Sequence, residues 1–185
     1  MIDDIKQDAD HRMHGAIEAL KRELSGIRTG RAAPALVERL VVDYYGAATP
    51  LNQLAGVSAP ESRLLVIQPW DRSSMSAIEK AILRSELGLT PNNDGHVIRL
   101  SIPPLTEERR KSLVRLVRAK VEEGKVAVRN VRRDAVDNIK ELTREHLIGE
   151  DDERRGLHEI EALAKRYVDE AERLGQVKEA EVLEV

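Results

Sequence analysis

Residues 125–134 read Lys-Val-Ala-Val-Arg-Asn-Val-Arg-Arg-Asp and lie within a segment, residues 106–146, that has no proline and one glycine. Apolar or small residues recur along this segment with a mean spacing of about 3.6, which predicts one long α-helix with a single buried stripe. The stripe consists of positions 113, 117, 121, 124, 128, 131, 135, 139 and 142.

The cations of this segment gather on one side of the predicted helix. At 100° per residue they fall within a sector about 100° wide, about 120° from the centre of the apolar stripe. We call them the basic ridge: Lys111, Arg115, Arg118, Lys125, Arg129, Arg132, Arg133 and Lys140. Acidic residues occupy most of the third side, at Glu123, Asp134, Asp137 and Glu141, and Glu122 lies among the cations.

Two interpretations of this charge pattern are open. One is a solvated helix carrying ion pairs between residues four apart. The other is a cationic surface that binds phosphate groups. Arginine predominates over lysine on the ridge. Its guanidinium forms forked hydrogen bonds to phosphate, so this excess favours phosphate binding over a role in solubility alone.

Composition excludes several classes of function. The 185 residues include no cysteine, which rules out disulfides, zinc thiolate sites and thiol catalysis. The N-terminal residues lack the apolar core of a signal peptide, and no run approaches the roughly 18 apolar residues of a membrane span. We therefore expect a soluble, cytoplasmic protein. The net charge of −3 conceals a basic segment, residues 105–146, followed by an acidic one, residues 147–185.

The remaining chain predicts two more long helices and a small domain. Apolar periodicity predicts helices over residues 2–29 and 151–183, so three helices, each with one apolar stripe, should form a bundle. Residues 31–104 are rich in β-formers and turn residues, and predict an α/β domain inserted between the first two helices. The domains are thus 1–30 with 105–185, and 31–104. A helix of about 40 residues is about 60 Å long, which favours an elongated molecule.

Within the inserted domain we expect extended segments at 40–45, 51–57, 64–67 and 97–100. A helix should begin at Ser73 or Ser74 and run to about residue 87, with Ile78, Ile82 and Leu83 facing inward. Asn92–Gly95 is a hairpin signal. Gly30 can adopt a left-handed conformation after the first helix, and Pro103 with Pro104 forms a stiff link, so the two crossings between domains predict a hinge.

No catalytic or metal-binding arrangement is evident. His11 and His14 lie three apart without the carboxylates of a metal site, and the phosphate-binding and nucleophile motifs are absent. Tyr44, Tyr45 and Trp70 could stack on bases, but we expect them to pack in the core and hinge, because so few aromatic residues are available.

Eight short motifs complete the pattern, and together they closely resemble the ribosome recycling factor family over essentially the whole chain. In order they are Ile27–Ala32, Tyr44–Leu51, Leu65–Asp71, Ile78–Ile82, Leu87–Leu89, Asn92–Gly95, Pro104–Arg110 and Lys125–Asp134. The last helix departs from the family's common Gln-Lys-Leu-Thr-Asp segment, with Glu-Ala-Leu-Ala-Lys at 161–165.

The resemblance implies an α+β, L-shaped, two-domain factor that acts with elongation factor G to split post-termination ribosomes. It implies a monomer that is not an enzyme and carries no cofactor, since the nucleotide belongs to the partner. The bundle would bind ribosomal RNA of the large subunit. The implied contacts are Arg132 foremost, then Arg129, Arg133, Lys125, Arg118, Arg110 and Arg28. The implied hinge comprises Arg28, Thr29, Gly30, Arg31, Pro103, Pro104 and Leu105.

Two alternatives remain at this point. A helical interaction module would use the bundle as a scaffold for a protein partner and show no salt-sensitive affinity for RNA. An enzyme acting on nucleic acid would need a paired carboxylate or histidine site, which the sequence does not offer.

Overall fold

The computed structural model describes residues 1–184, and their contacts divide them into two compact units. The first unit comprises Met1–Thr29 and Glu107–Glu184, and the second comprises Gly30–Thr106. The second unit is therefore inserted into the first, and the chain passes between them twice.

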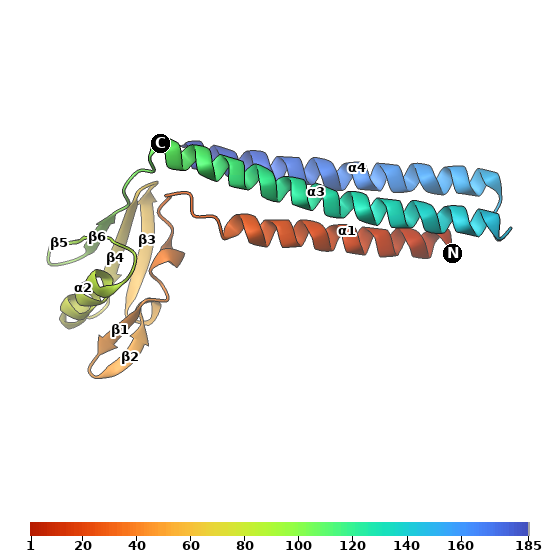
Figure 1. Ribbon diagram of the computed structural model, residues 1–185. Coiled ribbons are helices and arrows are strands. Elements are labelled where there is room, and N and C mark those ends of the chain that lie inside the picture. The colour runs from red at the N-terminus through yellow and green to blue at the C-terminus, as the bar shows by residue number, and fades with distance from the viewer. Residues whose placement is uncertain (185) are drawn as a thin grey trace. The chain divides into compact units, whose positions relative to one another are not determined.

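The first unit is a bundle of three long helices that lie side by side (Figure 1): α1 (Ile2–Ser25), α3 (Glu107–Arg144) and α4 (Glu150–Leu183). Helix α3 runs antiparallel to both neighbours. Ion pairs show its direction relative to α1, because Arg12 meets Asp134 while Glu23, further along α1, meets Lys120, earlier on α3.

The predicted apolar stripes form the core of the bundle. Seven of the nine stripe positions on α3 are buried, and the other two, Gly124 and Leu142, are partly buried. Glycines let the helices approach closely. A Cβ at Gly124 would lie 3.2 Å from Leu20, and one at Gly175 would lie 2.6 Å from Val121. At these two positions a larger side chain would press on the neighbouring helix.

The first helix is shorter than the sequence predicts. It ends at Ser25 rather than at residue 29, and Gly26 follows in a right-handed conformation. Ile27 continues the apolar period and is buried, but it lies outside the helix. Periodicity therefore overestimates the helix, because burial can continue after the regular backbone hydrogen bonding stops.

The second unit combines two antiparallel sheets with one helix, α2 (Met75–Arg84). Strands β1 (Val41–Tyr44) and β2 (Ala47–Pro50) form a hairpin. The larger sheet has the order β3-β4-β6-β5, with β3 (Ala55–Glu61), β4 (Leu64–Pro69), β5 (Pro91–Asn93) and β6 (Ile98–Ser101). Short 3₁₀ turns cover Pro34–Leu36, Leu51–Gln53 and Arg72–Ser74. The predicted hairpin at Asn92–Gly95 is confirmed by the β5–β6 pairing.

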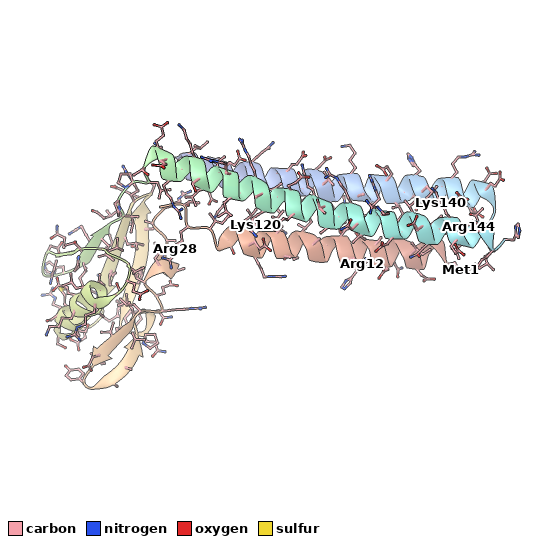
Figure 2. All side chains as sticks on the ribbon, viewed as in Figure 1. Met1, Arg12, Arg28, Lys120, Lys140 and Arg144 are labelled. Carbon is pink, nitrogen blue, oxygen red and sulfur yellow. The ribbon has the colours of Figure 1, made fainter. Side chains whose placement is uncertain are left out.

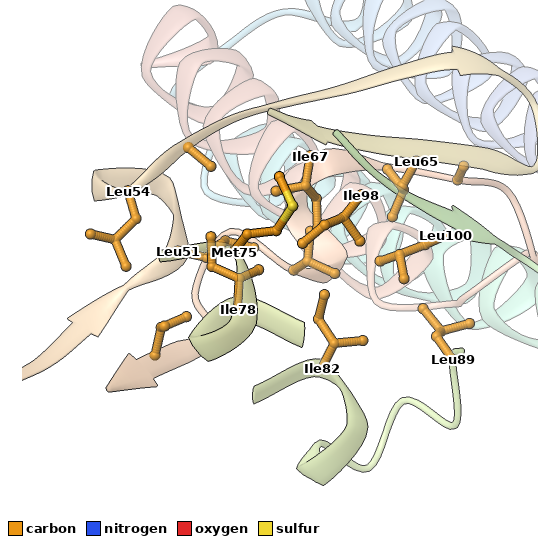
Figure 3. Packing of buried hydrophobic residues seen from close by; sticks show 14 residues of the cluster. Leu51, Leu54, Leu65, Ile67, Met75, Ile78, Ile82, Leu89, Ile98 and Leu100 are labelled. Atoms are coloured by element: carbon orange, nitrogen blue, oxygen red, sulfur yellow. The ribbon is translucent and has the colours of Figure 1, made fainter. Parts of the chain in front are cut away.

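The core of this unit is aliphatic. Ile78 and Ile82 of α2 point toward Leu65, Ile67, Ile98 and Leu100 of the sheet (Figure 3), and the six side chains are fully buried.

Several predictions for this unit are wrong in detail. Helix α2 ends at Arg84 rather than near residue 87. The segment 51–57 begins with a 3₁₀ turn, not a strand, and Leu83 is 62% exposed. Ser74 occupies the N-cap position of α2, as predicted, but its side chain makes no cap hydrogen bond. The Asp71 carboxylate instead caps the preceding turn and accepts from the Ser73 amide at 2.9 Å. Tyr45 and Trp70 are 80% and 70% exposed, so they do not pack in the core.

Candidate nucleic-acid interface

The basic ridge lies along one face of α3, as predicted, and most of its side chains reach solvent. Arg118 is 69% exposed, Arg129 44% and Arg132 39%, whereas Lys125 is only 15% exposed. Figure 2 shows Lys120, Lys140 and Arg144 placed along the same helix. The helix brings six of the seven predicted RNA-binding residues onto one element, since only Arg28 lies outside it.

The ridge cations of the middle segment pair with carboxylates of α4. Arg118 donates two hydrogen bonds to Glu179, from Nε at 2.8 Å and from Nη2 at 3.2 Å. Lys125 Nζ lies 3.1 Å from Glu172, and Arg132 Nη1 lies 3.3 Å from Glu161. The hydrogen bond from Arg118 to Glu179 raises the pKa of the guanidinium, and the bond to Glu172 raises the pKa of Lys125.

Glu122 contributes a further carboxylate from within the ridge. It lies 3.0 Å from Arg129 and 3.3 Å from Lys125, and these cations, Arg129 first, lower its pKa. The charge pattern is thus explained by pairs between helices as well as by pairs within α3. The interpretation as local ion pairs, four residues apart, applies at Lys111 with Glu107.

Helix α3 also forms ion pairs with α1. Asp134 accepts from Arg12 at 2.7 Å, and Lys120, which contacts Glu123, also contacts Glu23 of α1. Helix α3 therefore presents cations toward α4, and one carboxylate and one cation toward α1. This complementarity helps to set which neighbour lies on which side.

Several cations remain without a carboxylate. Among residues 1–184, Arg133, Arg110 and Arg28 have no hydrogen-bonded or ion-paired partner, and the same holds for the ridge residues Arg115 and Lys140. Arg133 is exposed and adjoins Arg132. Arg28 lies just beyond the end of α1 (Figure 2). These side chains are available to a ligand without breaking an ion pair.

The predicted hinge residues flank the two crossings between the units. Gly30 has the predicted left-handed backbone, with φ +75°, and a Cβ there would lie 2.9 Å from Leu105 Cγ. Next to the crossings, the amide of Ala32 donates to Ser62 O at 2.7 Å and that of Ile102 to Arg63 O at 2.8 Å. Both connecting segments are thus attached to neighbouring residues of the β3–β4 turn.

Sequence reasoning missed the α4 carboxylates that face the ridge. Glu172 and Glu179 are seven residues apart, as are Lys125 and Arg118 on α3, so matching heptad spacing was the available signal. Spacing alone did not reveal the register between the helices. Among residues 1–184 no cluster of histidine and carboxylate groups is suited to a metal ion. None of the helices within that range has an apolar stretch long enough to cross a membrane.

Comparison with known proteins gives consistent matches along the whole chain. The family model described as ribosome recycling factor matches residues 20–183. The ribosome-recycling factors of Thermomicrobium roseum and Carboxydothermus hydrogenoformans are 58% and 54% identical over 185 residues, 100% of each chain.

Solved structures agree. A solution structure of the ribosome recycling factor matches with a TM-score of 0.71 and 47% identity, over 100% of this chain and 98% of that one. Models for the T. thermophilus ribosome recycling factor and the E. coli elongation factor G bound to the E. coli post-termination complex match with a TM-score of 0.63 and 47% identity, covering 100% of both chains.

The fold and the ridge, taken with these matches, define the class of protein: a translation factor built as a three-helix bundle with an inserted α/β unit. Within that class, the chain belongs to the ribosome recycling factor family.

Proposed function

We propose that the protein binds the large ribosomal subunit in the post-termination complex through the basic ridge, and that it acts there as a monomer. With elongation factor G, and GTP hydrolysis on that partner, it splits the ribosome into subunits in the cytoplasm. The bundle is the anchor, and the α/β unit receives the force.

The observation that carries this proposal is that three arginines, Arg129, Arg132 and Arg133, lie close together on one face of α3. Arg133 has no partner among residues 1–184, and Arg132 makes a single contact to an exposed carboxylate. Arginines so placed can form forked hydrogen bonds to phosphate oxygens, which give affinity and position but no base specificity. A structured RNA such as that of the ribosome supplies the shape on which such contacts depend.

A related structure supports elongation factor G as the partner. A structure matching this chain holds a ribosome recycling factor together with elongation factor G on the post-termination complex. The hinge of Arg28–Arg31 and Pro103–Leu105 is part of the proposal, since force applied to the inserted unit must pass through the two crossings.

Light scattering of post-termination ribosomes tests the function. The signal should fall only when the protein, elongation factor G and GTP are all present, and Arg132→Ala should reduce the fall. The same variant should weaken binding to large subunits and lower the salt slope of binding by about one. Its thermal unfolding should change little, because Arg132 is partly exposed and its single ion pair is weak.

Arg144→Ala is the matched control, because it also removes an exposed arginine of α3 with a carboxylate partner, but outside the ridge. Splitting unaffected by Arg132→Ala, or equally reduced by Arg144→Ala, would remove the ridge from the proposed mechanism.

A further inference from the structure

The carboxylates of α4 that face the ridge follow the antiparallel register of the two helices. Going seven residues forward on α3, from Arg118 to Lys125, corresponds to going seven residues back on α4, from Glu179 to Glu172. These four side chains line one groove between the helices, of about 270 Å³, with Gly175 and Val121 beneath them. The groove therefore already holds an anionic group beside each cation.

Seven residues further along α3, the same register places a cation of α4, not a carboxylate, opposite the ridge. Seven residues beyond Lys125 is Arg132, and seven before Glu172 is Lys165, a cation whose Nζ turns to Asp169 at 2.7 Å. Arg132 reaches instead to Glu161, one helical turn away, with a single contact of 3.3 Å to a side chain that is 64% exposed. Pairing with α4 is thus weaker at Arg132 than at Arg118, which is held by two hydrogen bonds.

We propose that Glu161, Glu172 and Glu179 compete with RNA phosphates for the ridge and thereby determine which RNA it binds. This inference rests on the proposed function, in which the ridge binds ribosomal RNA. An RNA can contact Arg133 at once and displace Glu161 from Arg132 with little loss. It contacts Arg118 and Lys125 only by placing phosphates where Glu179 and Glu172 now lie, and Lys125 keeps a further contact of 3.3 Å to Glu122 of its own helix.

The physical consequence is selectivity. In each of these pairs at least one side chain is 50% or more exposed, so the pairs are weak. Each carboxylate therefore reduces phosphate binding by a factor of about 1.5 to 5, and three together by about tenfold. A ribosomal surface with phosphates in the right positions overcomes this competition through several simultaneous contacts. An arbitrary RNA makes fewer contacts and is bound less tightly, which fits a protein whose net charge is −3.

The test removes the three carboxylates without changing side-chain size, in the variant Glu161→Gln with Glu172→Gln and Glu179→Gln. Its control carries the same charge change on α4, where the partner cations lie outside the ridge: Glu159→Gln, Glu170→Gln and Glu181→Gln, whose partners are Lys6, Lys21 and Lys178. Binding of each protein to a short RNA duplex of arbitrary sequence and to large ribosomal subunits is measured over a range of salt.

We expect the ridge variant to bind the arbitrary duplex about tenfold more tightly than the control variant, with a steeper salt dependence. Its affinity for large subunits should rise less, so the ratio of the two affinities falls. Equal affinities of the two variants for the duplex would overturn the inference, since only total charge would then matter. An unchanged ratio between subunits and duplex would also overturn it.

Measurements on Arg132→Ala distinguish failure of this inference from failure of the proposed function. If Arg132→Ala weakens binding to large subunits while the ridge variant behaves like the control, only the role of the carboxylates fails. If Arg132→Ala leaves subunit binding unchanged, the proposed function of the ridge fails, and this inference fails with it.

Discussion

Gly15 and Gly175 both lie inside helices of the bundle, but an added side chain would meet different surroundings. A Cβ at Gly15 has no neighbour within 4 Å, whereas one at Gly175 would lie 2.6 Å from Val121 Cγ2. Gly15→Ala should therefore stabilise the protein by about 0.5–1 kcal/mol, through helix propensity. Gly175→Ala should destabilise it by about 1 kcal/mol, because overpacking against a stiff valine outweighs the gain in propensity. Thermal unfolding followed by circular dichroism at the helical band measures both changes.

The cause of the second effect can be isolated at Val121. In a Val121→Ala background the clash is removed, so Gly175→Ala should no longer destabilise, and the two substitutions should be strongly non-additive. A destabilisation of the same size in both backgrounds would show that the close approach of α3 and α4 at Gly175 is not responsible.

Among the elements, the β5–β6 hairpin depends on one carboxylate. Asp94 accepts from the amides of Val97 and His96, both at 2.9 Å, and from Arg99 Nη1 at 2.5 Å. These bonds, that of the Val97 amide first, hold its pKa well below the usual 3.8. A depressed pKa stabilises the folded state above the unfolded value of about 3.8, and this stabilisation is lost as pH falls through the folded pKa.

Asp94→Asn should therefore lower the unfolding temperature at pH 7, and the difference from wild type should shrink as pH falls below about 3.8. Glu86→Gln is the control, because Glu86 is exposed in the same unit and has no partner within residues 1–184. A constant difference between Asp94→Asn and wild type from pH 7 to strongly acidic solution would contradict the assignment.

The elements also show how far the sequence predicts the structure. Apolar spacing identifies α1, α3 and α4 and the buried face of each, because burial repeats with the helical period. It places the end of α1 four residues too late, because Ile27 is buried without being helical. It predicts the cations of the ridge but not their partners. Arg118 and Glu179 are 61 residues apart in sequence, so their pairing depends on the register between α3 and α4. Packing at residues such as Gly175 contributes to that register.

At the scale of the whole molecule, the chain joins the two units by two segments, and Gly30 lies in one of them. Its φ is +75°, and a Cβ there would lie 2.9 Å from Leu105, a residue of the other connecting segment. Gly30→Val thus introduces backbone strain and a contact that forces the two segments apart. If these segments form a hinge, we expect Gly30→Val to slow subunit splitting with elongation factor G and GTP severalfold, while affinity for the large subunit stays nearly constant.

Gly46→Val separates this effect from strain in general. Gly46 also has a left-handed backbone, with φ +80°, but a Cβ there has no neighbour within 4 Å, and the residue lies in the turn between β1 and β2. Its substitution should lower the thermal stability of the α/β unit and leave the rate of splitting unchanged at a temperature where that unit is folded. The hinge proposal fails if Gly46→Val slows splitting as much as Gly30→Val does, or if Gly30→Val reduces binding and splitting equally. If force passes through the crossings, Gly30→Val should reduce splitting and leave binding by α3 unchanged, because α3 lies in the other unit.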